Sequence, residues 1–167
     1  GYIGKITAQR AHALGMTVLA YDPFVTDEAA REFGAEKVDL DEGLARADFV
    51  SVHVRLMPET TGLVDLELMK KMKPSAVLVN TARGNLVDED ALYDALKANR
   101  ICGAGLDVYP DEPHIPPRLI ALPQVVLTPH IGTNTQETRL RMAEECARQI
   151  ADALAGKRPA HVVNGVE

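Results

Sequence analysis

Five short apolar runs, separated mostly by segments with helical character, constrain the fold of this chain more than any other feature. They span residues 18–21, 49–52, 76–79, 101–106 and 125–127. Each run is too short for a helix, and the lack of polar alternation is typical of strands that are covered on both faces. Alternating strands and helices predict an α/β fold, a Rossmann-like doubly wound parallel sheet with helices on both faces. Ligands of such sheets bind beyond the carboxyl ends of the strands.

Composition narrows the class of protein further. The length of 167 residues favours one domain, and 46% hydrophobic with 25% charged residues is average for a folded soluble protein. A net charge of −6 argues against a nucleic-acid partner, because phosphate backbones select basic surfaces. No run of about 18 apolar residues could span a membrane, and the first residues lack the layout of a signal peptide. We therefore expect no membrane partner and a cytoplasmic protein.

The two cysteines give no sign of metal binding. Cys102 lies in an apolar run and Cys146 lies within a helical pattern, without the spacing of a Cys/His site. We predict that both are small core residues of a reducing compartment and that the chain holds no metal.

Residues typical of helix ends support the predicted helices, and they do so independently of the spacing of hydrophobic residues. The predicted N-caps are Asp65, Asp88 and Asn134, the last in a capping box with Glu137. Gly15 and Gly156 are placed as C-terminal caps, where a left-handed residue is favoured.

The first four residues form half of a dinucleotide-binding turn. Gly1 and Gly4 match the second half of a G-x-G-x-x-G pattern that opens a helix, whose free N–H groups can bind a pyrophosphate. Asp22 follows the next apolar run and could accept both ribose hydroxyls of an adenosine, which favours NAD over NADP. A helix start with incidental glycines, and an ordinary Asp-Pro turn, are the alternatives.

Three further groups follow apolar runs and so should lie at the same edge of the sheet. Arg83, followed by Gly84, could pair its planar fork with a substrate carboxylate. His130 and a carboxylate from the segment 105–113 could form a proton-transfer pair, in which the acid raises the imidazole pKa. A solvated arginine and a structural histidine are the alternatives for each residue taken alone. His53, which follows another run, could line a cofactor crevice.

Taken together, the ordered motifs resemble the NAD-binding domain of the D-isomer-specific 2-hydroxyacid dehydrogenase family. The resemblance runs from Gly1 to about residue 164 and rests on GYIG, YDP, His53 with the following PET, NTARG, DVYPDEP and TPHIG. Single motifs of this kind are weak, but the ordered set is specific. It implies an NAD-dependent oxidoreductase that interconverts a D-2-hydroxy acid and a 2-keto acid by hydride transfer.

The resemblance also implies catalytic roles for three residues. His130 would donate a proton to the 2-keto oxygen and act as the base in the oxidative direction. Glu112 would hydrogen-bond His130 and keep it protonated near neutral pH. Arg83 would hold the substrate carboxylate and polarise the carbonyl group.

The cofactor-binding residues implied by the resemblance fall into three groups. The backbone at Tyr2 and Ile3 would hold the pyrophosphate, and Asp22 the adenosine ribose. The adenine and nicotinamide ends would be lined by Val54, Thr60, Thr81, Ala82, Arg83, Asp107, His130 and Gly132.

Two departures from the family pattern bear on the cofactor. Tyr2 stands where the family commonly has an arginine, and Arg55 stands where a proline is frequent. Arg55 could compensate for Tyr2 or soften the discrimination against NADP, so NADP is not fully excluded. We expect a preference for NAD of at least about tenfold, roughly 1.4 kcal/mol.

Against the family pattern, the first Rossmann strand and the substrate domain are absent from this chain. We predict a dinucleotide-binding domain at 1–156 and, at 157–167, a segment that leads toward the absent substrate domain. The 167 residues alone should be inactive, because half of the substrate cleft belongs to the absent domain. The family implies a homodimer for the full-length protein.

A second class of function shares these motifs. An NAD(H)-sensing binding protein without significant turnover, as in the C-terminal-binding-protein corepressors, keeps the same arginine, glutamate and histidine. A Rossmann methyltransferase is disfavoured, because it gives no reason for those three residues at separate strand ends. The sequence does not identify the 2-keto or 2-hydroxy acid substrate.

Overall fold

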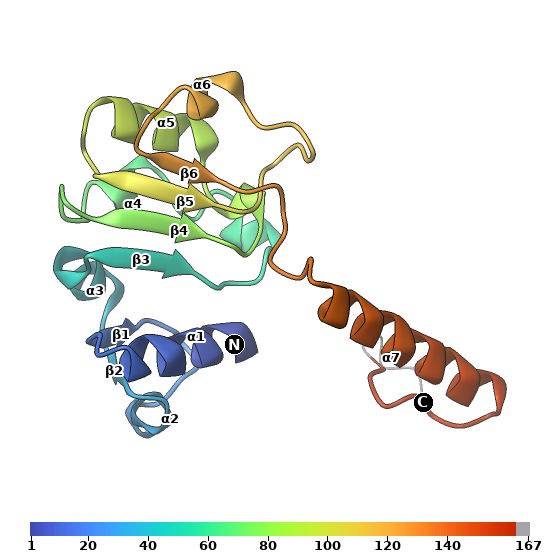
Figure 1. The fold of residues 1–167 in the computed structure, drawn as a ribbon. Coiled ribbons are helices and arrows are strands. Elements are labelled where there is room, and N and C mark those ends of the chain that lie inside the picture. The colour runs from blue at the N-terminus through green and yellow to red at the C-terminus, as the bar shows by residue number, and fades with distance from the viewer. Residues whose placement is uncertain (163–167) are drawn as a thin grey trace. The chain divides into compact units, whose positions relative to one another are not determined.

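The structure is a computed structural model that describes residues 1–162 of the chain. It divides into two compact units, Gly1–Pro129 and a second that begins at His130 (Figure 1). The predicted domain boundary at residue 156 stays a prediction.

A four-stranded parallel sheet is the centre of the first unit. Its strands lie in the order β3, β4, β5, β6. Their bounds are β3 Phe49–Val52, β4 Val77–Asn80, β5 Gly103–Leu106 and β6 Val125–Leu127. The helices that accompany them are α3 Leu40–Arg46, α4 Leu66–Met69, α5 Glu89–Lys97 and α6 Pro117–Ile120. The predicted Rossmann-like α/β class and these four strands are confirmed.

The hydrophobic core lies between this sheet and its helices. Leu78 of β4 and Leu92 and Leu96 of α5 are at most 1% exposed. Burying side chains of this size removes about 1.5–3 kcal/mol of unfavourable hydration each. Phe49 and Val126 of the outer strands are more than half exposed, so the expectation of strands covered on both faces holds for the inner strands better than for β3 and β6.

A separate two-stranded parallel sheet precedes the main one. It pairs β1, Val18–Ala20, with β2, Ala35–Lys37, and is accompanied by α1, Tyr2–Ala13, and α2, Asp27–Glu32. The sequence did not predict β2, because Glu36 and Lys37 are exposed and break the apolar pattern. Among the described residues β1 and β3 do not pair, so the six strands form two sheets.

Most predicted helix ends are confirmed. Asp65 and Asp88 accept hydrogen bonds from the backbone N–H groups of Leu68 and Ala91, at 2.8 and 3.0 Å. Gly15 and Gly156 have φ of 85° and 72°, in the left-handed region.

The predicted N-cap of the last helix was wrong by one residue. Helix α7, Gln136–Leu154, is capped by Thr135, whose Oγ1 accepts from the N–H of Thr138 at 3.2 Å. Asn134 accepts instead from Arg139 Nη1 at 3.3 Å. Two adjacent residues could each cap the helix, and the capping-box spacing to Glu137 favoured the wrong one.

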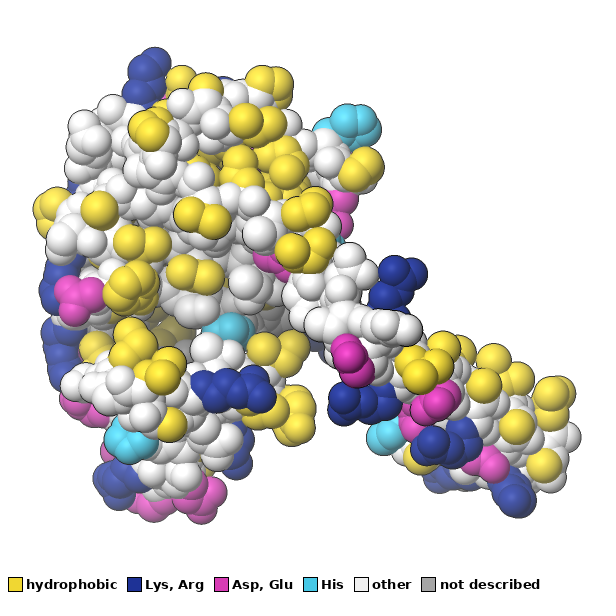
Figure 2. All heavy atoms as spheres, in the orientation of Figure 1, with side chains coloured by type: hydrophobic (Ala, Val, Ile, Leu, Met, Phe, Trp, Pro, Cys, Tyr) yellow, Lys and Arg dark blue, Asp and Glu magenta, His cyan; other side chains and the backbone are white. Residues whose placement is uncertain are grey.

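The second unit consists of α7 and the segment that follows it. No residue of α7 is buried, and Leu140, Met142, Ile150 and Leu154 are all more than half exposed. Figure 2 shows apolar side chains along one side of this helix. The segment after α7 turns back on it, where the His161 N–H donates to Gln149 Oε1 at 3.3 Å.

The prediction that both cysteines are core residues was wrong. Cys102 is exposed because β5 begins one residue later, at Gly103, and its side chain lies ahead of the covered part of the strand. Cys146 is exposed because it lies on α7. An apolar run and a helical pattern locate elements but do not say where their coverage ends.

Candidate active site

The turn after β4 is closed by one buried side chain. Asn80, 1% exposed, is the last residue of β4; its Oδ1 accepts from the N–H of Ala82 at 3.1 Å, and its Nδ2 donates to the carbonyl oxygen of Arg83 at 2.9 Å. A buried amide that is satisfied in this way holds the backbone in one conformation. The side chain of Arg83 is exposed, and its Nη1 donates to the carbonyl oxygen of Ala82 at 2.6 Å. The exposed Thr81 completes the turn.

Gly84 brings this turn against the segment that follows β5. A Cβ at Gly84 would lie 2.0 Å from the carbonyl carbon of Tyr109 and 2.4 Å from the nitrogen of Pro110. Only a residue without a side chain permits this approach. In the Arg83-Gly84 pair, the arginine side chain is therefore exposed, while the backbone of the glycine packs directly against the backbone of Tyr109.

Beyond β5, a buried carboxylate and a buried phenol connect two strand ends. Asp107, 7% exposed, accepts a hydrogen bond from Thr128 Oγ1 at 2.6 Å. The hydroxyl of Tyr109, which is 5% exposed, donates to the carbonyl oxygens of Leu106 at 3.0 Å and Thr128 at 2.9 Å. Burial raises the pKa of Tyr109, which favours the protonated phenol that makes these bonds.

Glu112 is tied to the same segment. Its Oε1 accepts from the backbone N–H of Tyr109 at 3.0 Å. The structure thus gathers the Arg83 turn, Asp107 and Glu112 around one short segment at the carboxyl edge of the sheet.

His130 and Gly132 belong to the second unit. His130 is exposed and has a φ of 52°, in the left-handed region that few residues other than glycine adopt. Its convergence with Arg83 and Glu112 stays a prediction.

The start of α1 carries the predicted phosphate-binding turn. Tyr2 and Ile3 are 80% and 68% exposed, so the amides of this first turn belong to an open helix end without acidic side chains. A Cβ at Gly4 would lie 3.3 Å from Cβ of His53, so the glycine lets α1 pack closely on the segment after β3. An anion is favoured at such a helix end.

Asp22 lies beside this helix end. Its Oδ2 is 3.6 Å from the nitrogen of Gly1, and its Oδ1 accepts from the N–H of Phe24 at 2.9 Å. The residue therefore makes the ordinary turn that was the alternative interpretation, and it also places a carboxylate next to the glycine turn. These residues fit a dinucleotide with two free ribose hydroxyls.

The loop after β3 is held by Thr60. Its Oγ1 accepts from the N–H of Met57 at 2.8 Å and donates to the carbonyl oxygen of Arg55 at 2.7 Å. The neighbouring Val54 is 38% exposed. Nε2 of His53 lies 2.9 Å from Oγ of Ser51. Burial lowers the pKa of the His53 imidazole.

Sequence reasoning missed three residues that shape this edge, Asn80, Tyr109 and Thr128. A polar residue that ends an apolar run, as Asn80 does, was the available signal. Tyr109 and Thr128 lie within the motifs DVYPDEP and TPHIG, in which other residues carry the predicted roles.

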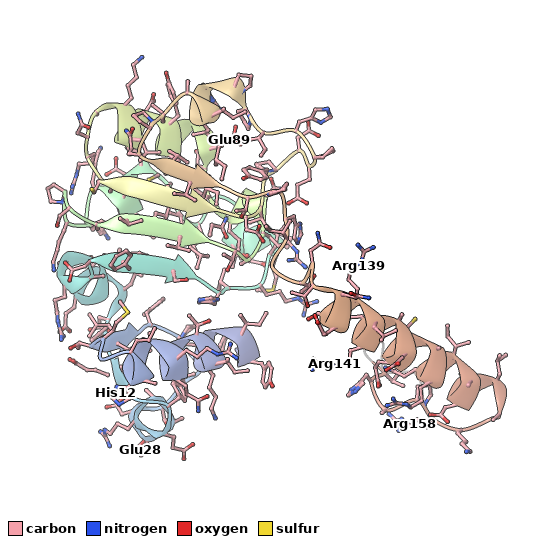
Figure 3. All side chains as sticks on the ribbon, viewed as in Figure 1. His12, Glu28, Glu89, Arg139, Arg141 and Arg158 are labelled. Carbon is pink, nitrogen blue, oxygen red and sulfur yellow. The ribbon has the colours of Figure 1, made fainter. Side chains whose placement is uncertain are left out.

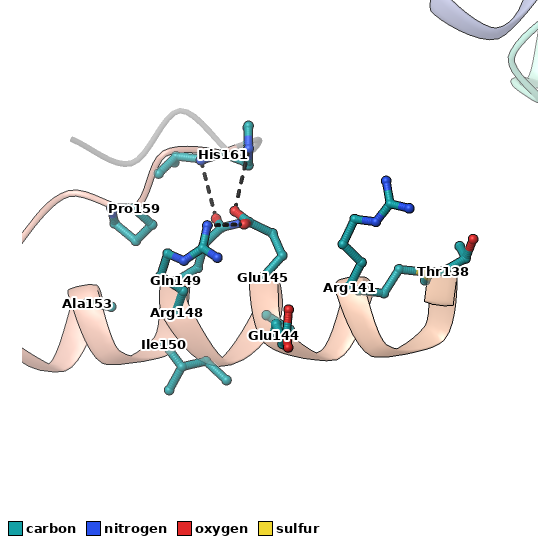
Figure 4. A pocket seen from close by; sticks show the side chains of 13 residues that line it. Thr138, Arg141, Glu144, Glu145, Arg148, Gln149, Ile150, Ala153, Pro159 and His161 are labelled. Carbon is teal, nitrogen blue, oxygen red and sulfur yellow. Dashed lines mark hydrogen bonds and ion pairs between the residues drawn. The ribbon is translucent and has the colours of Figure 1, made fainter. Parts of the chain in front are cut away.

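Other surfaces offer less chemistry. Among the described residues no group of three or more His, Cys, Asp or Glu could hold a metal, and no helix is long and apolar enough to cross a membrane. A shallow groove between α7 and residues 159–162 has charges that pair with each other, such as Arg148 with Glu145 at 2.8 Å (Figure 4). Glu89 of α5 (Figure 3) likewise pairs with Arg118, at 3.0 Å.

The parallel sheet, the glycine turn with Asp22 and the polar groups at the strand ends define a dinucleotide-binding α/β domain. The family model for the D-isomer specific 2-hydroxyacid dehydrogenase, NAD binding domain, matches residues 1–132. The chain therefore belongs to this family, as its NAD-binding domain.

Individual relatives agree with the family. The chain is 47% identical over 164 residues to D-3-phosphoglycerate dehydrogenase of Mycobacterium bovis, covering 98% of this chain and 31% of the relative. It is 44% identical to glyoxylate reductase of Thermococcus litoralis, covering 98% and 50%. The chain thus spans between about a third and half of the curated relatives that it matches.

Solved structures give the same result. The holo form of Rhodotorula graminis D-mandelate dehydrogenase superposes with a TM-score of 0.92 at 38% identity, covering 100% of this chain and 50% of that one. D-lactate dehydrogenase with NAD+ from Lactobacillus jensenii gives 0.89 at 34% identity, covering 98% and 53%. NAD is therefore the cofactor of this domain.

Proposed function

We propose that the protein to which this chain belongs interconverts a D-2-hydroxy acid and its 2-keto acid with NAD, and that this chain carries the catalytic residues. The observation that supports this most strongly is the gathering of the Arg83 turn, Asp107 and Glu112 at one strand edge. A family whose NAD-binding domain matches most of the chain supplies the reaction class.

Each catalytic residue has one task. Arg83 binds the substrate carboxylate through its guanidinium and stabilises negative charge on the carbonyl oxygen. His130 gives a proton to that oxygen during reduction and takes it back during oxidation. Glu112 accepts a hydrogen bond from the imidazole and stabilises its protonated form.

The cofactor would lie across the start of α1. The N–H groups of Tyr2 and Ile3 bind the pyrophosphate, and Asp22 binds the adenosine ribose and repels a 2′-phosphate. Val54 and Thr60 line the adenine end, whereas Thr81, Ala82, Asp107 and Gly132 surround the nicotinamide. When bound, the nicotinamide supplies or accepts the hydride. Every proton movement is left to the chain's own side chains.

The test uses the full-length gene product and follows NADH oxidation. The substrates are glyoxylate, hydroxypyruvate, 2-ketogluconate and phosphohydroxypyruvate. We expect turnover with at least one, and we expect H130Q and R83Q to lower kcat/KM by at least about 100-fold, because each removes a group that acts on the reacting oxygen. H114Q is the matched control, since that histidine is 80% exposed and pairs only with Asp111 among the described residues.

The outcome also decides the second candidate. Tight NADH binding without turnover on the whole panel would replace the enzyme with an NAD(H)-sensing binding protein. The resemblance of the ordered motifs to the corepressors keeps that candidate in the test.

Assembly and location complete the proposal. We propose a cytoplasmic homodimer for the full-length protein and no turnover for residues 1–167 alone, because the substrate cleft needs a second domain. Sedimentation of the full-length protein measures the first, and turnover by the purified 167-residue chain would contradict the second.

A further inference from the structure

Tyr109 contacts the segments that carry Arg83 and Glu112 and the strand end that precedes His130 in the sequence, and we infer that it is a positioning residue for these segments. This inference rests on the proposed function. Neither the sequence motifs nor the family match assigns Tyr109 a role. The inference is carried by three separate contacts of one buried residue.

The first contact is with the Arg83 turn. The carbonyl carbon of Tyr109 lies so close to Gly84 that a Cβ there would be 2.0 Å away. The backbone of Tyr109 is therefore the surface on which the turn after β4 rests. Because Asn80 ties the same turn to the end of β4, Arg83 is held from two sides.

The second contact is with Glu112. The N–H of Tyr109 donates to Glu112 Oε1 at 3.0 Å. This bond fixes one carboxylate oxygen of Glu112. A charge-assisted bond of this kind is stronger than a neutral one.

The third contact is with the strand end that leads to His130. The last register pair of β5 and β6 is Leu106 with Leu127, and the Thr128 N–H donates to the carbonyl oxygen of Leu106 at 2.9 Å. The Tyr109 hydroxyl donates to the Thr128 carbonyl oxygen at 2.9 Å, beyond that last pair. It thereby holds the chain two residues before His130 in the sequence.

The hydroxyl, rather than the ring, makes this third contact. Tyr109→Phe keeps the buried ring but removes the donor, so the carbonyl oxygens of Leu106 and Thr128 both lose this bond. The contacts to Gly84 and Glu112 come from the backbone and remain. The variant therefore tests the hydroxyl's contact with the strand ends alone, because it keeps the other two contacts and leaves no large cavity.

The test compares Y109F with Y93F in the full-length protein. Tyr93 is the control because no hydrogen bond of its hydroxyl is seen in the described residues. Its ring instead makes cation–π contacts with Lys97 and Arg118, whose charged groups each lie 5.5 Å from the ring centroid. We expect Y109F to lower kcat about tenfold with the KM for NADH within about twofold, because proton transfer depends steeply on geometry. Y93F should change neither.

A double variant shows whether Tyr109 acts through the acid and base. If it does, adding Y109F to E112Q should lower kcat by clearly less than the product of the single effects. A kcat for Y109F within twofold of wild type, or full additivity with E112Q, would overturn the inference. So would a loss of NADH affinity as large as the loss of kcat.

Hydrogen exchange provides a measurement that does not need turnover. We expect the N–H groups of Tyr109 and Thr128 to exchange about tenfold faster in Y109F and unchanged in Y93F, since the hydroxyl no longer joins the two segments. Unchanged exchange in Y109F would overturn the inference even if the wild-type protein turned over no substrate. Absence of wild-type turnover alone would contradict the proposed function instead.

Discussion

The carboxyl edge of the main sheet and the start of the chain present their functional groups in opposite ways. At the sheet edge, Asn80, Asp107 and Tyr109 are 1%, 7% and 5% exposed and are joined by internal hydrogen bonds. At the start of the chain, Tyr2 and Ile3 are 80% and 68% exposed. The turn that bears Arg83 and the segment that bears Glu112 are thus held by hydrogen bonds within the chain, whereas the cofactor end offers an open helix terminus.

This difference indicates which region determines the affinity for the cofactor and which determines the rate of the chemical step. A preorganised edge contributes mostly to the chemical step, because its groups need no rearrangement as charge develops. An exposed terminus contributes mostly to binding, and changes there should alter cofactor affinity more than kcat.

The largest effect is expected from G84A. The added Cβ would meet the Tyr109 carbonyl carbon at 2.0 Å, so the backbone must move apart and stability should fall by about 3 kcal/mol. Thermal or urea unfolding measures the loss. G105A is the control, since its Cβ would lie 3.9 Å from Val79 and make ordinary contact. Equal stability of the two variants would show that the sheet edge is not fixed as described.

Cofactor preference should depend on Asp22. We expect NADH to bind at least about tenfold more tightly than NADPH, or roughly 1.4 kcal/mol, because the carboxylate repels a 2′-phosphate. D22S should remove most of the difference in affinity between NADH and NADPH while leaving kcat nearly unchanged. Fluorescence titration with both dinucleotides measures it, and D27N, which removes an exposed charge on α2, is the control. Equal binding of both by the wild type would refute the preference.

A smaller effect is expected from Arg55. Its carbonyl oxygen is held by Thr60, and its exposed guanidinium makes no ion pair among the described residues. R55Q should widen the preference for NADH by about two- to fivefold, the range of a surface charge pair, because a cation that favours the 2′-phosphate is removed. R31Q, which removes a cation paired with Glu28, should leave the ratio unchanged. A narrower ratio in R55Q would assign Arg55 to the pyrophosphate instead.

The smallest effect concerns His53 and pH. Burial lowers its pKa in the folded protein, so the unfolded chain binds the proton more readily. Stability from the neutral imidazole is therefore present above the unfolded pKa of about 6.5 and is lost as the pH falls below it. H53Q should lose less melting temperature than the wild type between pH 8 and pH 5.5. Equal losses would show that His53 is solvated.

The strands were predictable from the sequence where coverage is complete. Residues 76–79 form an apolar run because β4 lies inside the sheet, and the run locates β4 to within a residue. The run 125–127 also locates β6, although Val126 is exposed at the edge of the sheet. The strand β2 was not predictable, because Glu36 and Lys37 leave no apolar run. The N-cap of α7 was ambiguous, because adjacent residues carry equivalent capping groups.

The functional side chains of the candidate site were predictable from the sequence, but the contacts that hold them in place were not. Arg83, Glu112 and Asp22 stood out as charged groups after apolar runs or within ordered motifs. Nothing in a run or a motif reveals that Gly84 must touch the carbonyl carbon of Tyr109, because that contact joins residues 25 positions apart. The placement of His130 relative to these groups stays a prediction.

The amide of Asn80 has a consequence for the kinetics of substrate capture. Because Asn80 closes the turn that bears Arg83 by hydrogen bonds within the chain, the proposed binding of a carboxylate to this guanidinium should meet a loop that is already folded. Capture should then be a single second-order event whose observed rate rises linearly with acid concentration. A plateau in that rate would mean that some other segment has to rearrange before the acid can be held.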